Sequence, residues 1–421
     1  MSQVTDRLKR RLRRFVGQSV RRLGVLPVGM ADRLGDDASL LGSTLAEEVM
    51  VYFPDTQESL YQLRQWYEPL KALHREHPVI VVCLDSRTAK LVREESGLRC
   101  VTIARYSTTD DLLSRSNVKL ALYVNHNWQN FINLRFLSVV HVHLQHGDGD
   151  KAVSVSNQLK AYDFSFVAGQ AAVDRAARHI MLYDAKARII PIGLPQVDAG
   201  RPAQASRTPG TLPTVLYAPT WEGAQPSVSY SSLPSHGEKM VDALLASGRY
   251  RVVYRPHPLA GVTDEATGQA DLRVRSLVSR AAEQAPGIGH RVDTAGEFRD
   301  SAAESDLLLC DVSAVTVEYL PTGKPLVVTV SANPQVAEAK TRLLDVVARV
   351  TAGDAERIVG IVDAQLQVDP QRTERLDLVE YYVGDTTPGV ATRRFIEACE
   401  HAMSVRDAAW PALEGPKLVG G

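Results

Sequence analysis

Residues 307–325 run LLLCDVSAVTVEYLPTGKP, and this stretch predicts the architecture of the whole chain. The apolar run Leu307–Cys310 is typical of a buried strand, and Ala314–Leu320 is typical of a helix. A second apolar run follows at Leu326–Val330. Strand, helix and strand in this order indicate a βαβ unit, in which the two strands are parallel.

The same alternation extends over most of the chain. Further strands are expected at Val49–Phe53, Val79–Leu84, Cys100–Ala104, Leu120–Val124, Val139–Leu144, Phe164–Val167, Ile189–Ile192, Thr214–Ala218, Val252–Arg255 and Arg291–Asp293. Further helices are expected at Glu58–His77, Ala89–Glu95, Trp128–Phe136, Glu238–Ala246, Leu272–Glu283, Ala337–Ala348 and Ala391–Met403. The proline-rich stretch Pro195–Pro213 divides the pattern into two similar parallel α/β halves, which implies a cleft between two domains.

The domain limits follow from this division. We expect a basic amphipathic helix and linker at 1–42, a first Rossmann-like domain at 43–200 and a second at 211–385. Residues 386–421 are expected to form a helix that crosses back onto the first domain, followed by a tail. A length of 421 residues agrees with two domains.

Composition indicates a globular protein of a reducing compartment. Hydrophobic residues make up 44% and charged residues 23% of the chain, and no apolar run approaches the ~20 residues of a membrane-spanning helix. The N-terminus has no apolar region of the signal-peptide type. The four cysteines are scattered without a C-x-x-C pair, which argues against a zinc site and fits the cytoplasm.

A cationic segment opens the chain although its net charge is only −1. Residues 1–24 carry a net charge of +7, and their apolar residues repeat at helical spacing. A helix of this kind can lie in a membrane interface and bind anionic headgroups. A solvated basic helix or a disordered arm would explain the same charges. No nucleic acid is expected as a partner.

Two histidines stand at the ends of predicted strands. His146, in HLQHGDGDK (143–151), is followed by glycines that permit close backbone approach to a ligand, and it suits a general base near neutral pH. His257, in RVVYRPHP (251–258), lies between two prolines that fix the backbone and hold the imidazole at the strand end, where it suits a pyrophosphate. Either histidine could instead be a structural one, satisfied by backbone hydrogen bonds.

Hydroxyl and charged side chains occur at the other strand ends. In YAPTWEG (217–223), Thr220 begins a loop and can donate to phosphate or sugar. Asp311 ends a strand, and Ser313 is a natural N-cap for a helix that brings Thr316 to the same side. Arg394 lies near the start of the last helix, where phosphate binding and a surface ion pair are both open.

Other polar residues of the strand ends favour structural roles. Asp148 and Asp150 form a D-x-D pair that can hold a divalent ion, but a turn with self-capping aspartates is the favoured interpretation. His141 and His143 alternate within a strand and are interpreted as structural.

Taken in order, these motifs resemble the CDP-glycerol glycerophosphotransferase family, the teichoic-acid primases and polymerases of Gram-positive envelopes. The family's HG-x-x-x-K, G-x-P-x-x-D, YAPTW, HP, T-D-x-S-S-V, K-P and G-x-A-x-x-R elements have counterparts in this chain. They are His146–Gly147 with Lys151, Gly193–Pro195 with Asp198, Tyr217–Trp221, His257–Pro258, Asp311–Thr316, Lys324–Pro325 and Gly389–Arg394. The resemblance covers roughly Val139–Arg394.

The resemblance implies a GT-B fold and a transferase. Such an enzyme moves glycerol phosphate, or a related polyol phosphate, from a CDP-activated donor to a hydroxyl of a membrane-associated polyol-phosphate or glycolipid acceptor. It implies a peripheral position on the inner face of the cell membrane, with no metal and no cofactor. The implied catalytic residues are His146 and His257, the implied donor-binding residues are Thr220, Asp311, Ser313, Thr316 and Arg394, and the implied acceptor-binding residue is Lys151.

Departures from the family pattern keep two other hypotheses open. Ala314 replaces the second serine of an S-S pair, Glu318–Tyr319 replaces an Asp-Phe pair, and Pro388 replaces an acid before the last G-x-A element. These changes are compatible with a GT-B glycosyltransferase that uses a nucleotide sugar, since one fold hosts several chemistries. A non-catalytic, membrane-bound partner in envelope assembly is the third hypothesis.

Overall fold

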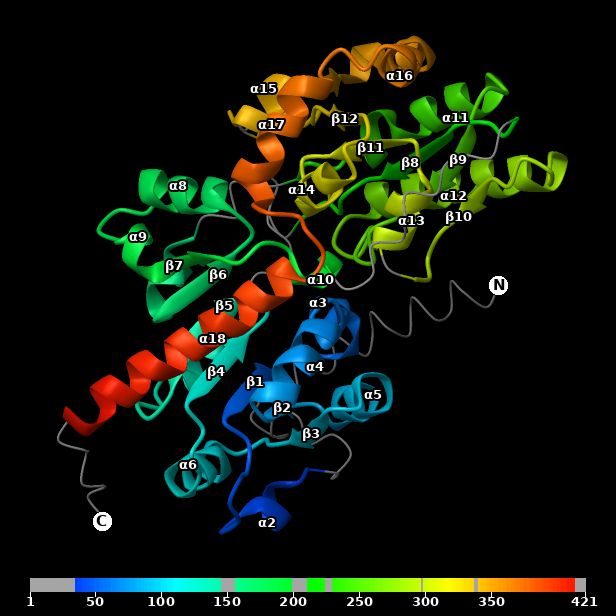
Figure 1. The fold of residues 1–421 in the computed structure, drawn as a ribbon. Helices are drawn as coiled ribbons and strands as arrows, with labels where there is room; N and C mark the ends of the chain where they lie inside the picture. The colour runs from blue at the N-terminus through cyan, green and yellow to red at the C-terminus, as the bar shows by residue number, and fades with distance from the viewer. Residues whose placement is uncertain are drawn as a thin grey trace. The chain divides into compact units, whose positions relative to one another are not determined.

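The computed structural model describes residues 35–144, 156–198, 210–223, 229–296, 298–336 and 340–412. The chain forms two compact units, shown in Figure 1. Unit 1 contains Met1–His146, Lys160–Phe166 and Ile396–Gly421, and unit 2 contains Gly147–Leu159 and Val167–Phe395. The predicted domain limits stay predictions.

The sheet centred on unit 1 has seven strands in the order β3-β2-β1-β4-β5-β6-β7. The strands are β1 Val49–Phe53, β2 Val79–Cys83, β3 Arg99–Thr102, β4 Leu120–Tyr123, β5 Val140–Leu144, β6 Phe164–Val167 and β7 Ile189–Pro191. The pairs from β3 through β6 are parallel, with Val49 opposite both Val79 and Leu120. Residues of β1, β2 and β4 are buried on both faces, as parallel strands covered by helices are.

The helices of unit 1 connect these strands. They are α2 Asp37–Leu40, α3 Tyr61–Arg64, α4 Tyr67–Glu76, α5 Ser86–Ser96, α6 Tyr106–Arg115 and α7 Asn130–Asn133. Helix α5 shows how local sequence sets their limits. Asp85 caps its start by accepting from the amides of Arg87 and Thr88, each at 3.0 Å, and Gly97 ends it in the left-handed region at φ 70°.

The sheet of unit 2 has six strands in the order β10-β9-β8-β11-β12-β13. The strands are β8 Thr214–Ala218, β9 Arg251–Tyr254, β10 Arg291–Val292, β11 Leu307–Asp311, β12 Leu326–Thr329 and β13 Ala348–Val350. Neighbouring strands in this sheet pair in parallel. The helices around it include α11 Glu238–Ala246, α12 Glu265–Gln284, α13 Phe298–Glu304, α14 Ala314–Tyr319, α15 Arg342–Val346, α16 Ile358–Gln367 and α17 Arg372–Val383. The remaining helices of unit 2 are α8 Gln170–His179, α9 Ala185–Arg188 and α10 Pro195–Asp198.

Alternate residues of the four central strands of unit 2, β9, β8, β11 and β12, enter different hydrophobic clusters. Leu308 and Cys310 of β11 pack with Leu216 in one cluster, whereas Leu307 and Leu309 pack with Tyr217 in another. A sheet with a cluster on each face is buried from both sides, which explains its nearly continuous apolar strands. The predicted class of two parallel α/β domains is therefore confirmed.

Several local predictions need correction. The expected helix Glu58–His77 is interrupted between α3 and α4, and the expected helix Trp128–Phe136 contains only the four residues of α7. The expected helix Ala337–Ala348 ends earlier and is followed by β13, a three-residue edge strand that apolar patterning did not separate from it. The stretch 25–42, predicted as linker, contains α2, and Asp37 there accepts from the amides of Ala104 and Arg105. The basic residues 1–24 lie outside the described residues.

The last helix, α18 Val390–Ala409, belongs to unit 2 up to Phe395 and to unit 1 from Ile396. Within unit 1, His77 joins this helix to the sheet, because Nδ1 lies 3.0 Å from Glu48 Oε2 and Nε2 lies 3.3 Å from Glu400 Oε1. Burial disfavours the imidazolium, but the two carboxylates outweigh this effect and raise the pKa of His77.

The His77 contacts predict a pH-dependent stability. Because the folded pKa exceeds the unfolded value of about 6.5, the stabilisation is complete below that value and is lost as pH rises through the folded pKa. Thermal unfolding of wild type and His77→Gln at pH 5.5 and pH 8.5 should therefore show a larger wild-type advantage at the lower pH. An equal advantage at both pH values would show that the ion pairs contribute nothing.

Candidate active site

The candidate site lies at the carboxyl edge of the unit 2 sheet, around β8 and β11. The direction in which the chain adds strands reverses between β8 and β11. Strands β9 and β10 lie on one side of β8, and β11 to β13 lie on its other side. Open parallel sheets bind ligands at such a switch point. Thr220 follows β8, and Asp311 is the last residue of β11.

Asp311 joins three segments at this edge. Its side chain is fully buried, and Oδ2 accepts from the Thr220 amide at 2.8 Å. Its Oδ1 accepts from the Ser232 amide at 3.2 Å and from the Thr329 hydroxyl at the end of β12. Burial raises the pKa of the Asp311 carboxyl, while these donors act to lower it. Both carboxylate oxygens are thus engaged by the protein, which gives Asp311 a structural role at the site.

His257 lies in the loop after β9 and is half-buried. Its Nδ1 accepts from the Leu259 amide at 3.1 Å, so a neutral imidazole here carries its proton on Nε2. Its ring stacks on Trp221, with ring centroids 6.1 Å apart and planes 18° from parallel. The preceding Arg255 donates to Asp293 Oδ2 and to the Gly296 carbonyl, each at 2.8 Å. Leu259 and Trp221 therefore hold the imidazole itself, and Arg255 holds the loop that carries it.

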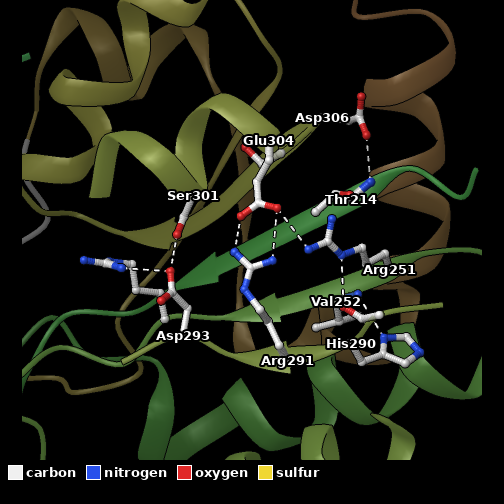
Figure 2. A network of polar contacts seen from close by, with 12 residues as sticks. Thr214, Arg251, Val252, His290, Arg291, Asp293, Ser301, Glu304 and Asp306 are labelled. Atoms are coloured by element: carbon white, nitrogen blue, oxygen red, sulfur yellow. Dashed lines mark hydrogen bonds and ion pairs between the residues drawn. The ribbon is translucent and has the colours of Figure 1, made fainter. Parts of the chain in front are cut away.

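A polar network joins α13 to the neighbourhood of β9 and β10, as Figure 2 shows. Glu304 of α13 lies between Arg251 of β9 and Arg291 of β10 and forms an ion pair with each. Nearby, the Ser301 hydroxyl donates to Asp293. Arg251 begins β9 and Arg291 begins β10, so Glu304 holds the amino ends of these strands, away from the His257 loop. The Ser301 bond joins α13 to Asp293, which in turn accepts from Arg255.

Glu222 binds the loop after His257 to the loop after β8. Its carboxylate is almost fully buried, with 5% of the residue exposed. Oε2 accepts from the Gly261 amide at 2.9 Å, and Oε1 accepts from the amides of Thr263 at 2.7 Å and Asp264 at 3.0 Å. The Thr263 hydroxyl also donates to Oε1 at 2.9 Å. The segment Thr220–Glu222 thus contacts Asp311, His257 and the 261–264 loop in three consecutive residues.

The helix after β11 presents the two predicted hydroxyls. Ser313 occupies the N-cap position of α14, as predicted, but its side chain makes no capping bond and donates instead to the Asp311 carbonyl at 3.2 Å. Thr316 donates to the Ser313 carbonyl at 2.6 Å. Both residues are buried, and each hydroxyl oxygen keeps acceptor capacity.

Two motifs separated by about half the chain meet in unit 2. Asp198 Oδ1 and Oδ2 accept from the amides of Gly389 and Thr392, each at 2.7 Å, and so cap the start of α18. Gly193 adopts φ 82°, and a Cβ there would lie 2.8 Å from the Ala391 Cβ. The close packing and the cap together fix the first turn of α18, which carries Arg394.

Arg394 is half-buried and lies near the chain segment before α18. Its Nη1 lies 3.1 Å from the position of a Cβ built on Gly384. The pKa of Asp385 is lowered mainly by hydrogen bonds from Thr387, and the charge of Arg394 adds to this effect.

Lys324 has a different role from a ligand-binding lysine. Its Nζ donates to the carbonyls of Ala303 and Ser305, each at 2.6 Å, and thereby caps the end of α13.

Some predicted residues are not placed. His146, Asp148, Asp150 and Lys151 lie outside the described residues. Within the described ranges, no group of three or more His, Cys, Asp or Glu side chains is arranged to hold a metal ion. No helix of the described part is long and apolar enough to cross a membrane.

Sequence reasoning missed Glu222 and Ser232 and gave no role to Asp198. The partners of Glu222 and Asp198 are mainly backbone amides, and Ser232 contributes its own amide to Asp311. Backbone amides leave no residue-type signal in the sequence. For Asp198, its place in the G-x-P-x-x-D element was a signal that the residue matters, without indicating its partner.

Comparison with known proteins identifies the class. The family model of CDP-Glycerol:Poly(glycerophosphate) glycerophosphotransferase matches residues 121–345, more than half of the chain. No curated protein matches the sequence. The chain is similar in fold to the wall teichoic acid polymerase TagF, with a TM-score of 0.54, 13% identity and coverage of 96% of this chain and 98% of that one.

Other solved structures have the same fold. MnaA from S. aureus, solved with UDP, gives a TM-score of 0.52 at 13% identity, with 86% of this chain and 98% of that chain covered. A glycosyltransferase from Rickettsia africae gives 0.50 at 13% identity, with 85% and 99% covered. These likenesses confirm the GT-B class. The chain belongs to the CDP-glycerol glycerophosphotransferase family and is an enzyme of that type.

The Glu222 contacts predict a loss of site geometry in Glu222→Gln. An amide can replace only one of two carboxylate oxygens as an acceptor, and charged hydrogen bonds contribute about 1.5–3 kcal/mol each. We expect a lower melting temperature and a weaker protective effect of CDP-glycerol in a thermal-shift assay. The matched control is Glu265→Gln, at an exposed glutamate of the first turn of α12. Equal behaviour of the two variants would contradict the role of Glu222.

The packing of Gly193 on Ala391 predicts that Gly193→Ala is strongly destabilising. The control is Gly389→Ala, which shares a positive φ, 87° against 82°, but has no atom within 4 Å of the added Cβ. Backbone strain of about 1–2 kcal/mol is common to both variants, so the excess for Gly193→Ala measures the contact with α18. Urea unfolding that gives equal losses would show that this contact is not tight.

Proposed function

We propose that the protein transfers glycerol phosphate, or a related polyol phosphate, from a CDP-activated donor to a hydroxyl of a membrane-associated, teichoic-acid-like acceptor. The family match supports the reaction type. The observation that carries the assignment of the donor site is the segment Thr220–Glu222, which gathers Asp311, His257 and the 261–264 loop at the switch point of the unit 2 sheet.

The donor diphosphate is assigned to this edge. His257 carries its proton on Nε2 when neutral, because Nδ1 accepts from Leu259, and it can donate from Nε2 to a phosphate oxygen. Arg394 supplies a cation from α18, and Thr220 lies at the neighbouring strand end. The hydroxyls of Ser313 and Thr316 donate to backbone carbonyls here and would turn to donate to a phosphate oxygen when the donor binds. Fixed donors of this kind stabilise negative charge that develops on a leaving phosphate without reorganisation.

The chemical step needs one proton acceptor and one leaving group. His146 takes the proton of the acceptor hydroxyl, and the acceptor oxygen forms a bond to the phosphorus that carries the glycerol. The bond from that phosphorus to the bridging oxygen breaks, and CMP leaves with both electrons of that bond. Lys151 is assigned to the phosphate of the acceptor. The basic segment 1–24 is assigned to the anionic inner face of the cell membrane.

The assignment of roles is tested by transfer of label from CDP-glycerol to membranes. We expect His146→Ala and His257→Ala each to lower the rate by roughly 10²–10⁴-fold, as loss of a general base or of a charge-stabilising donor does. The control is His179→Ala, at an exposed histidine of α8, which should keep the wild-type rate.

The substrate assignment is tested with a panel of labelled donors. Transfer from CDP-glycerol or another CDP-polyol, with none from UDP-sugars, is the expected result. Transfer from a UDP-sugar alone would contradict the proposal in favour of a glycosyltransferase. Binding of CDP-glycerol without transfer to any membrane fraction would favour the non-catalytic hypothesis that Ala314 and Pro388 keep open.

A further inference from the structure

An apolar surface in unit 1 is exposed where the chain leaves β4. Trp128 is 67% exposed and Leu137 is 70% exposed, and between them Phe131 and Ile132 are about 40% exposed. Four large apolar side chains exposed within ten residues form more than the scattered single residues of an ordinary surface. We call Trp128, Phe131, Ile132 and Leu137 the α7 surface.

The helix in this segment has its polar side buried and its apolar side exposed. Asn130 and Asn133 of α7 are buried, and their side chains donate to the protein. Asn130 Nδ2 donates to the Asn125 carbonyl at 2.7 Å and to the Tyr162 hydroxyl at 3.1 Å, and Asn133 Nδ2 donates to the Tyr123 hydroxyl at 2.7 Å. A rotation that buried Phe131 and Ile132 would break these bonds.

This orientation is the reverse of that of a helix whose outer side faces water. Buried amide hydrogen bonds are costly to lose, so the protein holds the apolar side chains outward against the hydrophobic effect. Burial of these apolar side chains against a partner of low polarity would remove the cost of exposing them to water.

The charges around the α7 surface fit an anionic partner. Residues 124–144 contain no aspartate or glutamate. The guanidinium of the exposed Arg135 lies 4.4 Å from the centroid of the Tyr106 ring, and that ring stacks on Phe136 at 4.9 Å. Arg105, next to Tyr106, is also exposed. Exposed tryptophan and phenylalanine with arginine alongside are typical of a membrane interface, where rings lie at headgroup depth and cations bind lipid phosphate.

We propose that the α7 surface, with Arg135, docks unit 1 onto an anionic lipid bilayer. Its apolar side chains insert at the level of the headgroups, and Arg135 binds lipid phosphate. This contact is separate from the basic segment 1–24. The proposal rests on the proposed function, because a membrane-associated acceptor would bring the enzyme to a bilayer. A second copy of the chain is the competing occupant, and the experiment distinguishes the two.

The test is sedimentation of the full chain with vesicles of phosphatidylcholine and phosphatidylglycerol, and with phosphatidylcholine alone. The variant is Trp128→Ser with Ile132→Ser. The matched control is Met181→Ser with Val368→Ser, which removes two apolar side chains that are 75% and 73% exposed in unit 2. We expect the control to bind mixed vesicles as the wild type does, and the α7 variant to bind about tenfold or more weakly.

Salt separates this contact from that of the basic segment. Attraction between the cations of residues 1–24 and the lipid is screened at high salt, whereas apolar insertion is not. We expect wild type and control to keep residual binding to mixed vesicles at high salt, and the α7 variant to lose it. Equal binding of wild type and α7 variant under both conditions would overturn the proposal.

Fluorescence reports on insertion directly. Wild-type emission should shift to the blue when mixed vesicles are added, and Trp128→Phe should lose this shift while still sedimenting with the vesicles. A shift that persists in Trp128→Phe would contradict insertion at this residue.

Two further measurements make the outcomes distinguishable. If light scattering shows that wild type is a dimer and the α7 variant a monomer, with vesicle binding unchanged, the surface is an interface between copies and the proposal fails. Protection of the α7 variant from heat by CDP-glycerol should equal that of the wild type. Absence of such protection in the wild type would count against the proposed function alone and would leave the vesicle result intact.

Discussion

The buried carboxylate of Asp311 is the constraint on which the candidate site depends. A charge without exposure to water is costly unless hydrogen bonds replace its hydration, and here two backbone amides and one hydroxyl do so. These bonds fix the loop after β8, the segment at Ser232 and the end of β12 relative to β11. The carboxylate of Glu222 is also buried, and it accepts hydrogen bonds from three amides and a hydroxyl. These bonds hold the chain that follows His257. The site is thus assembled by carboxylates that accept from backbone amides, and these bonds position Thr220 and the loop that carries His257.

The start of α18 is held by a similar device. Asp198 caps the helix, and the absence of a side chain at Gly193 lets the chain approach Ala391 closely. Because both contacts lie within one turn of Arg394, the position of that guanidinium depends on residues about 200 positions earlier in the chain. This dependence explains why a glycine, a small residue and an acid occur together in motifs that carry no chemistry of their own.

The alternation of apolar runs and helical spacers predicted two parallel sheets because strands buried on both faces leave an unmistakable apolar pattern. It failed at the edge, where β13 is only three residues long and follows directly on α15. The strand-end residues Thr220, His257 and Asp311 were identified as candidates because parallel strands bring their carboxyl ends to one edge. The residues that hold them in place, Glu222 above all, were not found, because their partners are backbone amides far along the chain. The sequence shows the type of each side chain, but it does not show which backbone amide that side chain will bind.

We propose that an activated diphosphate binds at the carboxyl edge of the unit 2 sheet. A crystal structure of the protein with CDP-glycerol tests it most directly. The diphosphate should lie within hydrogen-bond distance, about 3 Å, of His257 Nε2 and of the hydroxyls that follow β11. A nucleotide bound elsewhere, with His257 more than a water molecule away from either phosphorus, would contradict it.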